Sequence, residues 1–493
     1  MALKHNIIAN YIGRVYLIVI GIVMVPFYLH YLGAEAYGLV GFNALIDGWM
    51  IMLDLGLSPT ISREVSKTLA TNKPKEKENF KYLFHSVEFI FIILSITAIA
   101  SIVLGSNWIT NSWLNVEKLD KNSVSYAISL IGIMVGLRFL SILYKSGITA
   151  SEEQVWYNKA NITLSSLRYI GAFLLIKYIS NDFKHFFEYL LAIVVLEFIV
   201  YSFKFYSIMN IGGFRLYFSL EKIKPIIKFA ISIGYTGGIW IFITQLDKLL
   251  LSNILPLKEF GYFTIVAIIA NAVIQISEPI HYAILPRLTA LYSQKKMQEL
   301  FKTYKNATLL LAIVAFSVGG VVSIYSYQLL YSWTGDIEAS KWGKDILFWY
   351  VLANSLLALT TLQVYLQIAY GKLKLNVIYH TIALFLYSPL VFIVAYNYSV
   401  VNIAQLWFSF VLLTFIVWMP IVHKTFAPKI HKEWLFKIIL PIFISTSTYL
   451  WILNSLNLDF SQNRAILFAT LLLIGAGLLA VNYLISRVFY SLK

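Results

Sequence analysis

The 493-residue chain is 59% hydrophobic and only 13% charged, with a mean hydropathy of +0.74, which excludes an ordinary soluble globular domain. The lack of cysteine excludes disulfides, thiol catalysis and cysteine-ligated metal sites. The net charge of +15 does not indicate nucleic-acid binding, because the basic residues lie between apolar runs rather than in one patch. We therefore predict an all-α, polytopic membrane protein.

Fourteen apolar runs are each long enough to cross a bilayer, since about 20 apolar residues span the hydrocarbon core. We predict that they form 14 transmembrane helices. The first run lacks a convincing small-residue cleavage site and is expected to be retained. In chain order the predicted spans are 9–31, 37–60, 82–105, 124–148, 157–178, 184–208, 228–254, 260–285, 306–332, 345–370, 375–397, 401–423, 435–455 and 464–487.

Lysine and arginine are distributed unequally between the two sides of the predicted bundle. The side of the termini, which includes the connections 60–82, 145–159 and 204–228, holds 27 of these residues, and the opposite side holds 8. This bias predicts that both termini are cytoplasmic and that the basic connections anchor to anionic lipid. The opposite loops are short, the longest running from about 106 to 122, and leave no room for an extracytoplasmic catalytic domain.

The helical hairpin at residues 7–66 is predicted to recur at 228–290. Four matches support this repeat at offsets between 218 and 224: Tyr37-Gly38 with Phe260-Gly261, Arg63 with Arg287, Ser112-Trp113 with Ser332-Trp333, and Asn158 with Asn376. Six spans separate the copies, so the halves should form a parallel repeat with the substrate site between them near mid-membrane. The alternative is chance matching of similar hydropathy.

The repeat predicts four parts of the chain. They are an N-lobe of six helices (1–210), a basic cytoplasmic linker (211–227), a C-lobe of six helices (228–423) and two extra C-terminal helices (424–493).

Several motifs resemble those of a known transporter family. They are Tyr31-Leu-Gly-Ala-Glu-Ala-Tyr-Gly38, Leu53-Asp-Leu-Gly-Leu-Ser-Pro59, Ser62-Arg-Glu-Val65, Gln245-Leu-Asp-Lys-Leu-Leu-Leu251 and Phe260-Gly-Tyr262. With the two six-helix lobes and the extra C-terminal pair, they resemble the Wzx-type O-antigen flippases. These form part of the polysaccharide-export branch of the multidrug/oligosaccharidyl-lipid/polysaccharide (MOP) exporter superfamily.

The resemblance implies a function and a location. It implies that the chain moves an undecaprenyl-diphosphate-linked oligosaccharide from the cytoplasmic to the periplasmic leaflet of the bacterial inner membrane. It also implies a role in O-antigen, lipopolysaccharide or other polysaccharide biosynthesis, beside polymerase and chain-length machinery.

Four cations lie inside predicted spans, where ionisable side chains are costly and usually face a wet cavity or a partner. We predict that they bind the substrate diphosphate, because arginine donates bidentate hydrogen bonds to phosphate. They are Arg14, Arg138, Arg168 and Lys248. For the arginines the alternative is structural pairing with Asp47, Asp54, Glu188 or Glu197. For Lys248 the alternative is a side chain that snorkels outward.

Three carboxylates are predicted to couple export to the entry of H⁺ or Na⁺: Asp47, Asp54 and Asp247. Asp47 and Asp54 are seven residues apart and should share one face of the second helix. For Asp54 the alternative is local, since it precedes Gly56 and Pro59 and can orient a break in the helix. Beyond a coupling ion we expect no cofactor.

The chain contains no G-x-x-x-x-G-K-[ST] and no H-E-x-x-H motif, so we expect a transporter rather than an ATPase or a metalloenzyme. We predict alternating access, driven by an ion gradient, the membrane potential or removal of product. One alternative is an O-antigen polymerase or membrane glycosyltransferase, which normally needs a large extracytoplasmic loop. Another is a drug/cation antiporter of the same fold, which should have a carboxylate-lined cavity and twelve spans.

Overall fold

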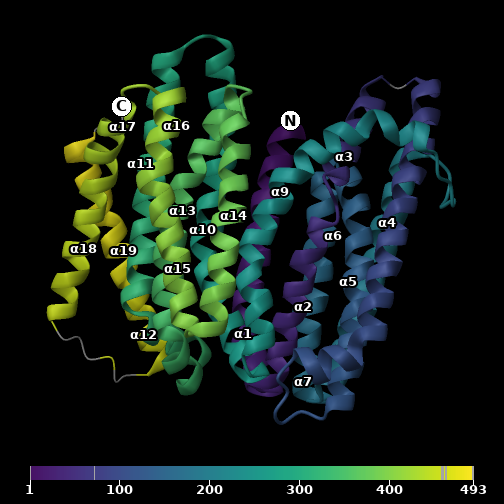
Figure 1. Cartoon of the computed structure of the whole chain (residues 1–493), viewed down its shortest axis with the longest axis horizontal. Coiled ribbons are helices and arrows are strands. Elements are labelled where there is room, and N and C mark those ends of the chain that lie inside the picture. Colours follow the sequence, from purple (N-terminus) through teal and green to yellow (C-terminus); the bar gives the residue numbers. More distant parts are fainter. Residues whose placement is uncertain (1, 72, 457–459, 461–462, 491–493) are drawn as a thin grey trace. The chain divides into compact units, whose positions relative to one another are not determined.

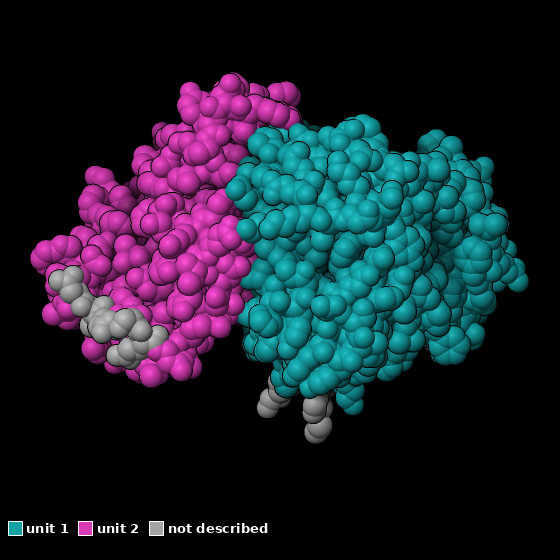
Figure 2. Space-filling model, turned by 90° about the horizontal axis from the view of Figure 1, so that it is seen from below, with its two compact units in different colours: residues 1–261 teal, residues 262–493 magenta. Residues whose placement is uncertain are grey.

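The computed structural model describes residues 2–71, 73–456, 460 and 463–490. Both termini, residue 1 and residues 491–493, lie outside it. The described residues are almost entirely helical, and their one isolated β-bridge joins Asn115 to Pro256. Two compact units divide the chain, an N-terminal unit of residues 1–261 and a C-terminal unit of residues 262–493, coloured separately in Figure 2. The all-α class predicted from the sequence is confirmed.

The N-terminal unit contains the first nine α-helices, two π-helical turns and the start of α10. Its elements are α1 (Ala2–Leu32), α2 (Ala34–Met52), α3 (Leu57–Thr71), α4 (Pro74–Trp108), η1 (Ile109–Trp113), α5 (Lys121–Ala150), α6 (Gln154–Ser166), η2 (Leu167–Gly171), α7 (Ala172–Tyr178), α8 (Phe183–Met209), α9 (Leu220–Ile254) and α10 (Leu257–Ser293). Helix α9 packs against α2, α3 and α4 of this unit.

The C-terminal unit contains the rest of α10 and all later elements. These are α11 (Met297–Ile324), α12 (Ser326–Thr334), α13 (Ile337–Ala369), α14 (Lys374–Asn397), α15 (Val400–Leu413), η3 (Thr414–Trp418), α16 (Met419–Phe426), α17 (Ile430–Glu433), η4 (Trp434–Ile439), α18 (Leu440–Ser455) and α19 (Arg464–Phe489). The boundaries of lobes and linker predicted from the repeat stay a prediction.

The predicted count of fourteen membrane spans is not confirmed by the described residues. Among the described residues, eleven helical segments are long and apolar enough to cross a membrane by length and composition. A bent pair, α2 with α3, would make twelve. The predicted spans 157–178 and 228–254, which correspond to α6 to α7 and to α9, are not among them. The chain is a multi-pass membrane protein, but the count of fourteen is not confirmed.

The second predicted span is broken rather than continuous. Helix α2 ends at Met52, and α3 leaves it at an angle of 60°. Leu55 and Gly56 both have positive φ, at 48° and 76°, a conformation in which glycine avoids the steric cost of a Cβ atom. The prediction that Asp47 and Asp54 share one helix face is therefore wrong, because Asp54 lies in the turn and not in α2.

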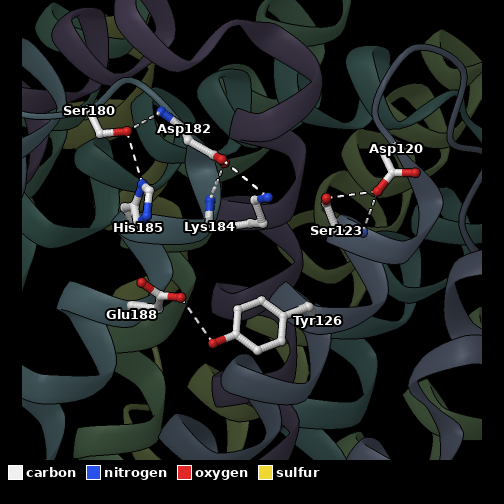
Figure 3. Close-up of polar contacts among 8 residues, drawn as sticks. All are labelled: Asp120, Ser123, Tyr126, Ser180, Asp182, Lys184, His185 and Glu188. Atoms are coloured by element: carbon white, nitrogen blue, oxygen red, sulfur yellow. Dashed lines mark hydrogen bonds and ion pairs between the residues drawn. The ribbon is translucent and has the colours of Figure 1, made fainter.

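Helix α5 is the centre of the N-terminal unit, packing along both α4 and α8. The starts of α5 and α8 are fixed by caps, shown in Figure 3: Asp120 accepts hydrogen bonds from Ser123 (2.8 and 2.9 Å), and Asp182 accepts one from the backbone of Lys184 (2.9 Å). The hydroxyl of Tyr126 on α5 donates to Glu188 on α8 (3.0 Å), which sets the two helices side by side at this end.

One close contact has the same offset as the predicted repeat. A Cβ atom at Gly38 would meet the carbonyl oxygen of Leu257, and one at Gly261 would meet that of Ala34. Gly38 and Gly261 are 223 residues apart in the sequence, and so are Ala34 and Leu257. The same offset matches Tyr37-Gly38 with Phe260-Gly261. Two glycines thus let α2 and the start of α10 approach backbone to backbone, in the reciprocal manner that a duplicated segment predicts.

In the C-terminal unit α13 is the central helix and packs against α11, α12 and α15. The last two helices, α18 and α19, pack on each other and on α11, as Figure 1 shows. Neutral hydrogen bonds join these layers: Asn482 of α19 donates to Ser317 of α11 (2.9 Å) and to Thr446 of α18 (2.8 Å). The predicted C-terminal pair is thus an integral layer of this unit.

Candidate functional site

Arg138 of α5 forms an ion pair with Asp47 of α2. The guanidinium nitrogen Nη1 lies 2.5 Å from Asp47 Oδ2 and 3.5 Å from Asn43 Oδ1. Asn43 and Asp47 are one helical turn apart on α2 and face the same way, so one arginine reaches both. The arginine side chain is 17% exposed and the aspartate 30%. The pair is therefore partly open and not sealed in the packed core.

Arg168 lies in the π-helical turn η2, between α6 and α7, and forms an ion pair with the buried Glu197 of α8. Tyrosines from two other helices bind carbonyls of this turn: Tyr28 of α1 donates to Tyr169 (2.8 Å) and Tyr189 of α8 to Leu167 (2.7 Å). These bonds satisfy backbone carbonyls that the wide π-helical turn leaves less well paired. Turns of this kind are frequent at functional sites.

Lys145 is a third cation of this region. It falls both at the end of the predicted span 124–148 and in the connection 145–159, where it is counted as a loop cation, but α5 continues to Ala150 and keeps Lys145 inside the helix. Its ammonium lies 4.7 Å from the centroid of the Tyr201 ring, and it interacts electrostatically with Arg168, Arg138 and Asp47. The missed signal is the spacing, because residues 138 and 145 are seven apart and share one face of α5.

These residues form a cationic cluster, defined as Arg138, Lys145 and Arg168 with the carboxylates Asp47 and Glu197. Three cations face two carboxylates, so the cluster has a net positive charge. Several of its polar atoms are buried without a partner among the described residues: Arg138 Nε, Arg168 Nε, Glu197 Oε2 and the hydroxyl of Tyr201. Buried polar groups are normally hydrogen-bonded, so this pattern suits a site that binds water or an anionic ligand.

The pairing alternative considered for the arginines is thus realised for two of them. Arg138 pairs with Asp47 and Arg168 with Glu197, both named as available partners from the sequence. Pairing does not use all their donors, since each Nε remains without a partner among the described residues. The structure brings Arg138, Arg168 and Asp47 together and adds Lys145 and Glu197.

Arg14 is half-buried on α1, in a region where α1 packs closely on α6. A Cβ atom at the preceding Gly13 would meet the side-chain oxygen of Asn158, whose amide donates to Asn10 (2.6 Å). The hydroxyls of Tyr16 and Ser166 lie 2.5 Å apart one turn further along this interface. Arg14 therefore lies on a rigid helix pair next to the turn that holds Arg168.

Lys248 and Asp247 lie on α9. Lys248 Nζ donates to Gln245 (3.1 Å), and Gln245 packs against Gly48 of α2. Asp247 is buried, and its carboxylate accepts the backbone N–H of Lys248 (2.7 Å). These contacts place both residues on the helix that packs along α2, but they do not join Lys248 to the cationic cluster.

Asp54 has a local structural contact. Its carboxylate accepts hydrogen bonds from the backbone and the hydroxyl of Ser58, at 2.9 and 2.6 Å. The carboxylate thus satisfies one of the first backbone N–H groups of α3, which have no partner within the helix. The structure thus realises the alternative, a carboxylate that orients the break, while ion coupling by Asp54 remains a prediction.

Comparison with known proteins identifies the family. Residues 3–292 match the family described as polysaccharide biosynthesis protein. A protein of Shigella flexneri named "Putative O-antigen transporter" is 21% identical over 411 residues, which are 83% of this chain and 94% of that protein.

Solved structures show the same fold at low sequence identity. The lipid II flippase MurJ, in an inward closed conformation, is 16% identical and aligns over 98% of each chain with a TM-score of 0.73. An inward-facing multidrug resistance transporter of the MATE family, in the MOP superfamily, is 12% identical, with a TM-score of 0.67 over 84% of this chain and 99% of its own. The family resemblance drawn from the sequence is confirmed: the chain belongs to the polysaccharide biosynthesis protein family and has the fold of MOP-superfamily transporters.

Proposed function

We propose that this protein is a flippase that moves an undecaprenyl-diphosphate-linked oligosaccharide from the cytoplasmic to the periplasmic leaflet of a bacterial inner membrane. The observation that supports this most directly is the cationic cluster, which has more cations than carboxylates and in which the Nε atoms of Arg138 and Arg168 have no partner among the described residues. A diphosphate offers several acceptor oxygens and negative charge, and it suits the unpaired donors of Arg138 and Arg168 better than a cationic drug does.

The similar proteins support the same choice of substrate class. Their names refer to O-antigen and to lipid II, and the lipid II flippase aligns over 98% of this chain, compared with 84% for the MATE drug transporter. The presence of the two C-terminal helices α18 and α19 is consistent with the longer alignment to the lipid II flippase. We propose alternating access with both termini in the cytoplasm, driven by H⁺ or Na⁺ entry or by the membrane potential, and supply of product to a polysaccharide polymerase.

Substrate binding by the cluster, and by Arg14 on the neighbouring helix α1, is tested by removing one positive charge at a time. Lys145→Gln and Arg14→Ala should abolish, or reduce at least tenfold, the surface polysaccharide of cells that depend on this gene, because either change weakens the cationic surface offered to the diphosphate. Polysaccharide is measured on gels of cell-surface extracts, and the amount of protein in the membrane is measured by immunoblotting.

Lys177→Gln is the matched control. Lys177 is an exposed cation of the same unit that lies over the Phe173 and Tyr178 rings, outside the cluster. Its loss changes the net charge by the same amount and should leave surface polysaccharide unchanged. Normal polysaccharide in both Lys145→Gln and Arg14→Ala cells would contradict a substrate role for this region.

A further inference from the structure

A second ionisable cluster lies in the N-terminal unit, away from the cationic cluster, and is centred on Glu88 of α4. This carboxylate is 0% exposed. It accepts hydrogen bonds from the hydroxyls of Tyr144 of α5 (2.6 Å) and Tyr206 of α8 (2.5 Å), and His85 Nδ1 lies 3.0 Å from its other oxygen. Three helices thus direct three neutral or titratable groups at one buried carboxylate.

The Glu88 carboxylate has no lysine or arginine partner within the part of the chain that the structure describes. Its recorded contacts are the two tyrosines and His85, and salt bridges to it come from His85 alone. Three lysines of the surrounding helices have other contacts: Lys145 lies over Tyr201, Lys204 of α8 lies 3.4 Å from Glu153, and Lys222 of α9 donates to Asn79 of α4. An ionised carboxylate buried without a cation is costly, even when three donors stabilise it.

His85 can supply the missing positive charge. The ring is 1% exposed, and its Nε2 is buried without a partner among the described residues. A neutral ring that donates from Nδ1 to Glu88 leaves Nε2 as a bare acceptor. One proton added to the pair, on Nε2 or on the carboxylate, cancels the buried negative charge. Because the two groups are in contact, the proton belongs to the pair rather than to either residue.

The surroundings of the pair separate it from bulk water on most sides. Phe84 stacks on Phe205 with ring centroids 4.4 Å apart, and Phe198 meets the Tyr144 ring at 5.9 Å. Tyr206 is the one of the carboxylate's two tyrosine partners that is only half-buried, since Tyr144 is buried. The residue after His85, Ser86, accepts a hydrogen bond from the backbone of Ser219 (3.0 Å), where the chain enters α9. The helix turn that holds the pair is thus tied to the connection between α8 and α9.

We propose that the Glu88–His85 pair is a proton-binding site, and that the proton it takes up is the one whose movement drives transport. The second half of this inference rests on the proposed function, whereas the first half does not. The site differs from the predicted coupling residues Asp47 and Asp54, which are bound to Arg138 and Ser58.

Proton uptake by the purified full-length protein tests the first half without any substrate. Between about pH 8 and pH 5.5, a range above the titration of ordinary carboxyl groups, the unmodified protein should take up about one proton per chain more than Glu88→Gln. A soluble pH indicator after rapid acidification measures this difference. Equal uptake by the two proteins would overturn the inference.

Glu188→Gln is the matched control, because Glu188 also accepts a tyrosine hydroxyl but is exposed. It should take up the same number of protons as the unmodified protein. If Glu88→Gln fails to fold, Tyr206→Phe decides, since it keeps the ring and removes one of the three donors. The midpoint of uptake should then move to higher pH, and an unchanged midpoint would refute the site.

Transport by proteoliposomes tests the second half. The probe is undecaprenyl diphosphate carrying one radiolabelled sugar, and its exposure to a membrane-impermeant oxidant reports flipping. A proton gradient should accelerate flipping severalfold in the unmodified protein and leave Glu88→Gln at its rate without a gradient. Acceleration retained in Glu88→Gln would refute coupling. Proton uptake without any flipping by the unmodified protein would instead count against the proposed function alone.

Discussion

The two compact units of this transporter differ in their buried carboxylates. In the described part of the N-terminal unit four such residues are buried: Glu35, Glu88, Glu197 and Asp247. The buried polar residues described in the C-terminal unit are serine, threonine, asparagine, glutamine and histidine, and Glu278 of α10 is half-buried there. Ion pairs occur in both units, since Lys305 and Glu433 of the C-terminal unit lie 2.7 Å apart, but the carboxylates that are fully buried among the described residues belong to the N-terminal unit.

The buried carboxylates of the N-terminal unit also differ among themselves. Glu35 accepts backbone N–H groups of Glu117 and Lys118, at 2.7 and 3.0 Å, and holds a loop. Glu197 pairs with an arginine, whereas Glu88 meets only tyrosines and a histidine among the described residues. Burial alone therefore does not identify a functional carboxylate. The partners of these carboxylates differ in kind: backbone N–H groups for Glu35, an arginine for Glu197, and tyrosines and a histidine for Glu88.

The largest expected effect is that of Arg168→Met, which leaves Glu197 buried without its cation. We expect a loss of about 3 kcal/mol of unfolding free energy and the loss of transport, because an uncompensated buried charge is strongly destabilising. Thermal unfolding in detergent and surface polysaccharide measure the two effects.

The double variant Arg168→Met with Glu197→Met distinguishes these effects. Replacing both partners with apolar side chains removes the unpaired charge, so most of the stability should return while transport stays absent. A double variant that transports normally would show that the pair is structural. An Arg168→Met protein with an unchanged unfolding temperature would show that the buried Glu197 carboxylate does not need this arginine as its partner.

A smaller effect is expected from Asn482→Leu in the C-terminal unit. The change removes hydrogen bonds to Ser317 and Thr446, and buried hydrogen bonds of this kind contribute about 1 kcal/mol each. Unfolding should therefore occur at a lower temperature, while the pH dependence of transport stays as in the unmodified protein. A changed pH dependence would contradict the assignment of the proton-binding site to the N-terminal unit.

The smallest effect is expected from Asp120→Ala at the start of α5. Hydrogen bonds from Ser123 hold the pKa of Asp120 below its ordinary value of 3.8, so the cap stabilises the folded state above that pH and loses its effect as the pH falls through the lowered value. Asp120→Ala should thus unfold slightly earlier than the unmodified protein at neutral pH. The difference in stability between Asp120→Ala and the unmodified protein should disappear on acidification below about pH 4. Asp120→Asn should differ little from the unmodified protein at neutral pH.

Much of the fold was predictable because apolar runs and breaks are local signals. The helical class, the long spans and the break near Gly56 and Pro59 all follow from composition and spacing. The predicted count of fourteen spans is not confirmed, since the described residues of α6 to α7 and of α9 do not give helices that pass for spans by length and composition. Helix ends are also uncertain by a few residues, which moved Lys145 from α5 into a loop.

The site was predictable only in part. Charges at membrane depth pointed to Arg138, Arg168 and Asp47, but their partners depend on tertiary contacts between α2, η2, α5 and α8. The pair His85 and Glu88 is three residues apart and readable as one helix face. Nothing in that spacing reveals that Tyr144 and Tyr206, from helices distant in sequence, complete the site.

The π-helical turn that holds Arg168 has a consequence for chain length. Such a turn contains one residue more than an α-helical turn, so it behaves as a single-residue insertion within one continuous helix. Deleting Ile170 would permit regular α-helix, but it would rotate Arg168 by about 100° relative to α7 and turn it away from Glu197. The number of residues between Ser166 and Ala172 is therefore constrained as strictly as the arginine itself, and a deletion there would disable the ion pair without changing either partner.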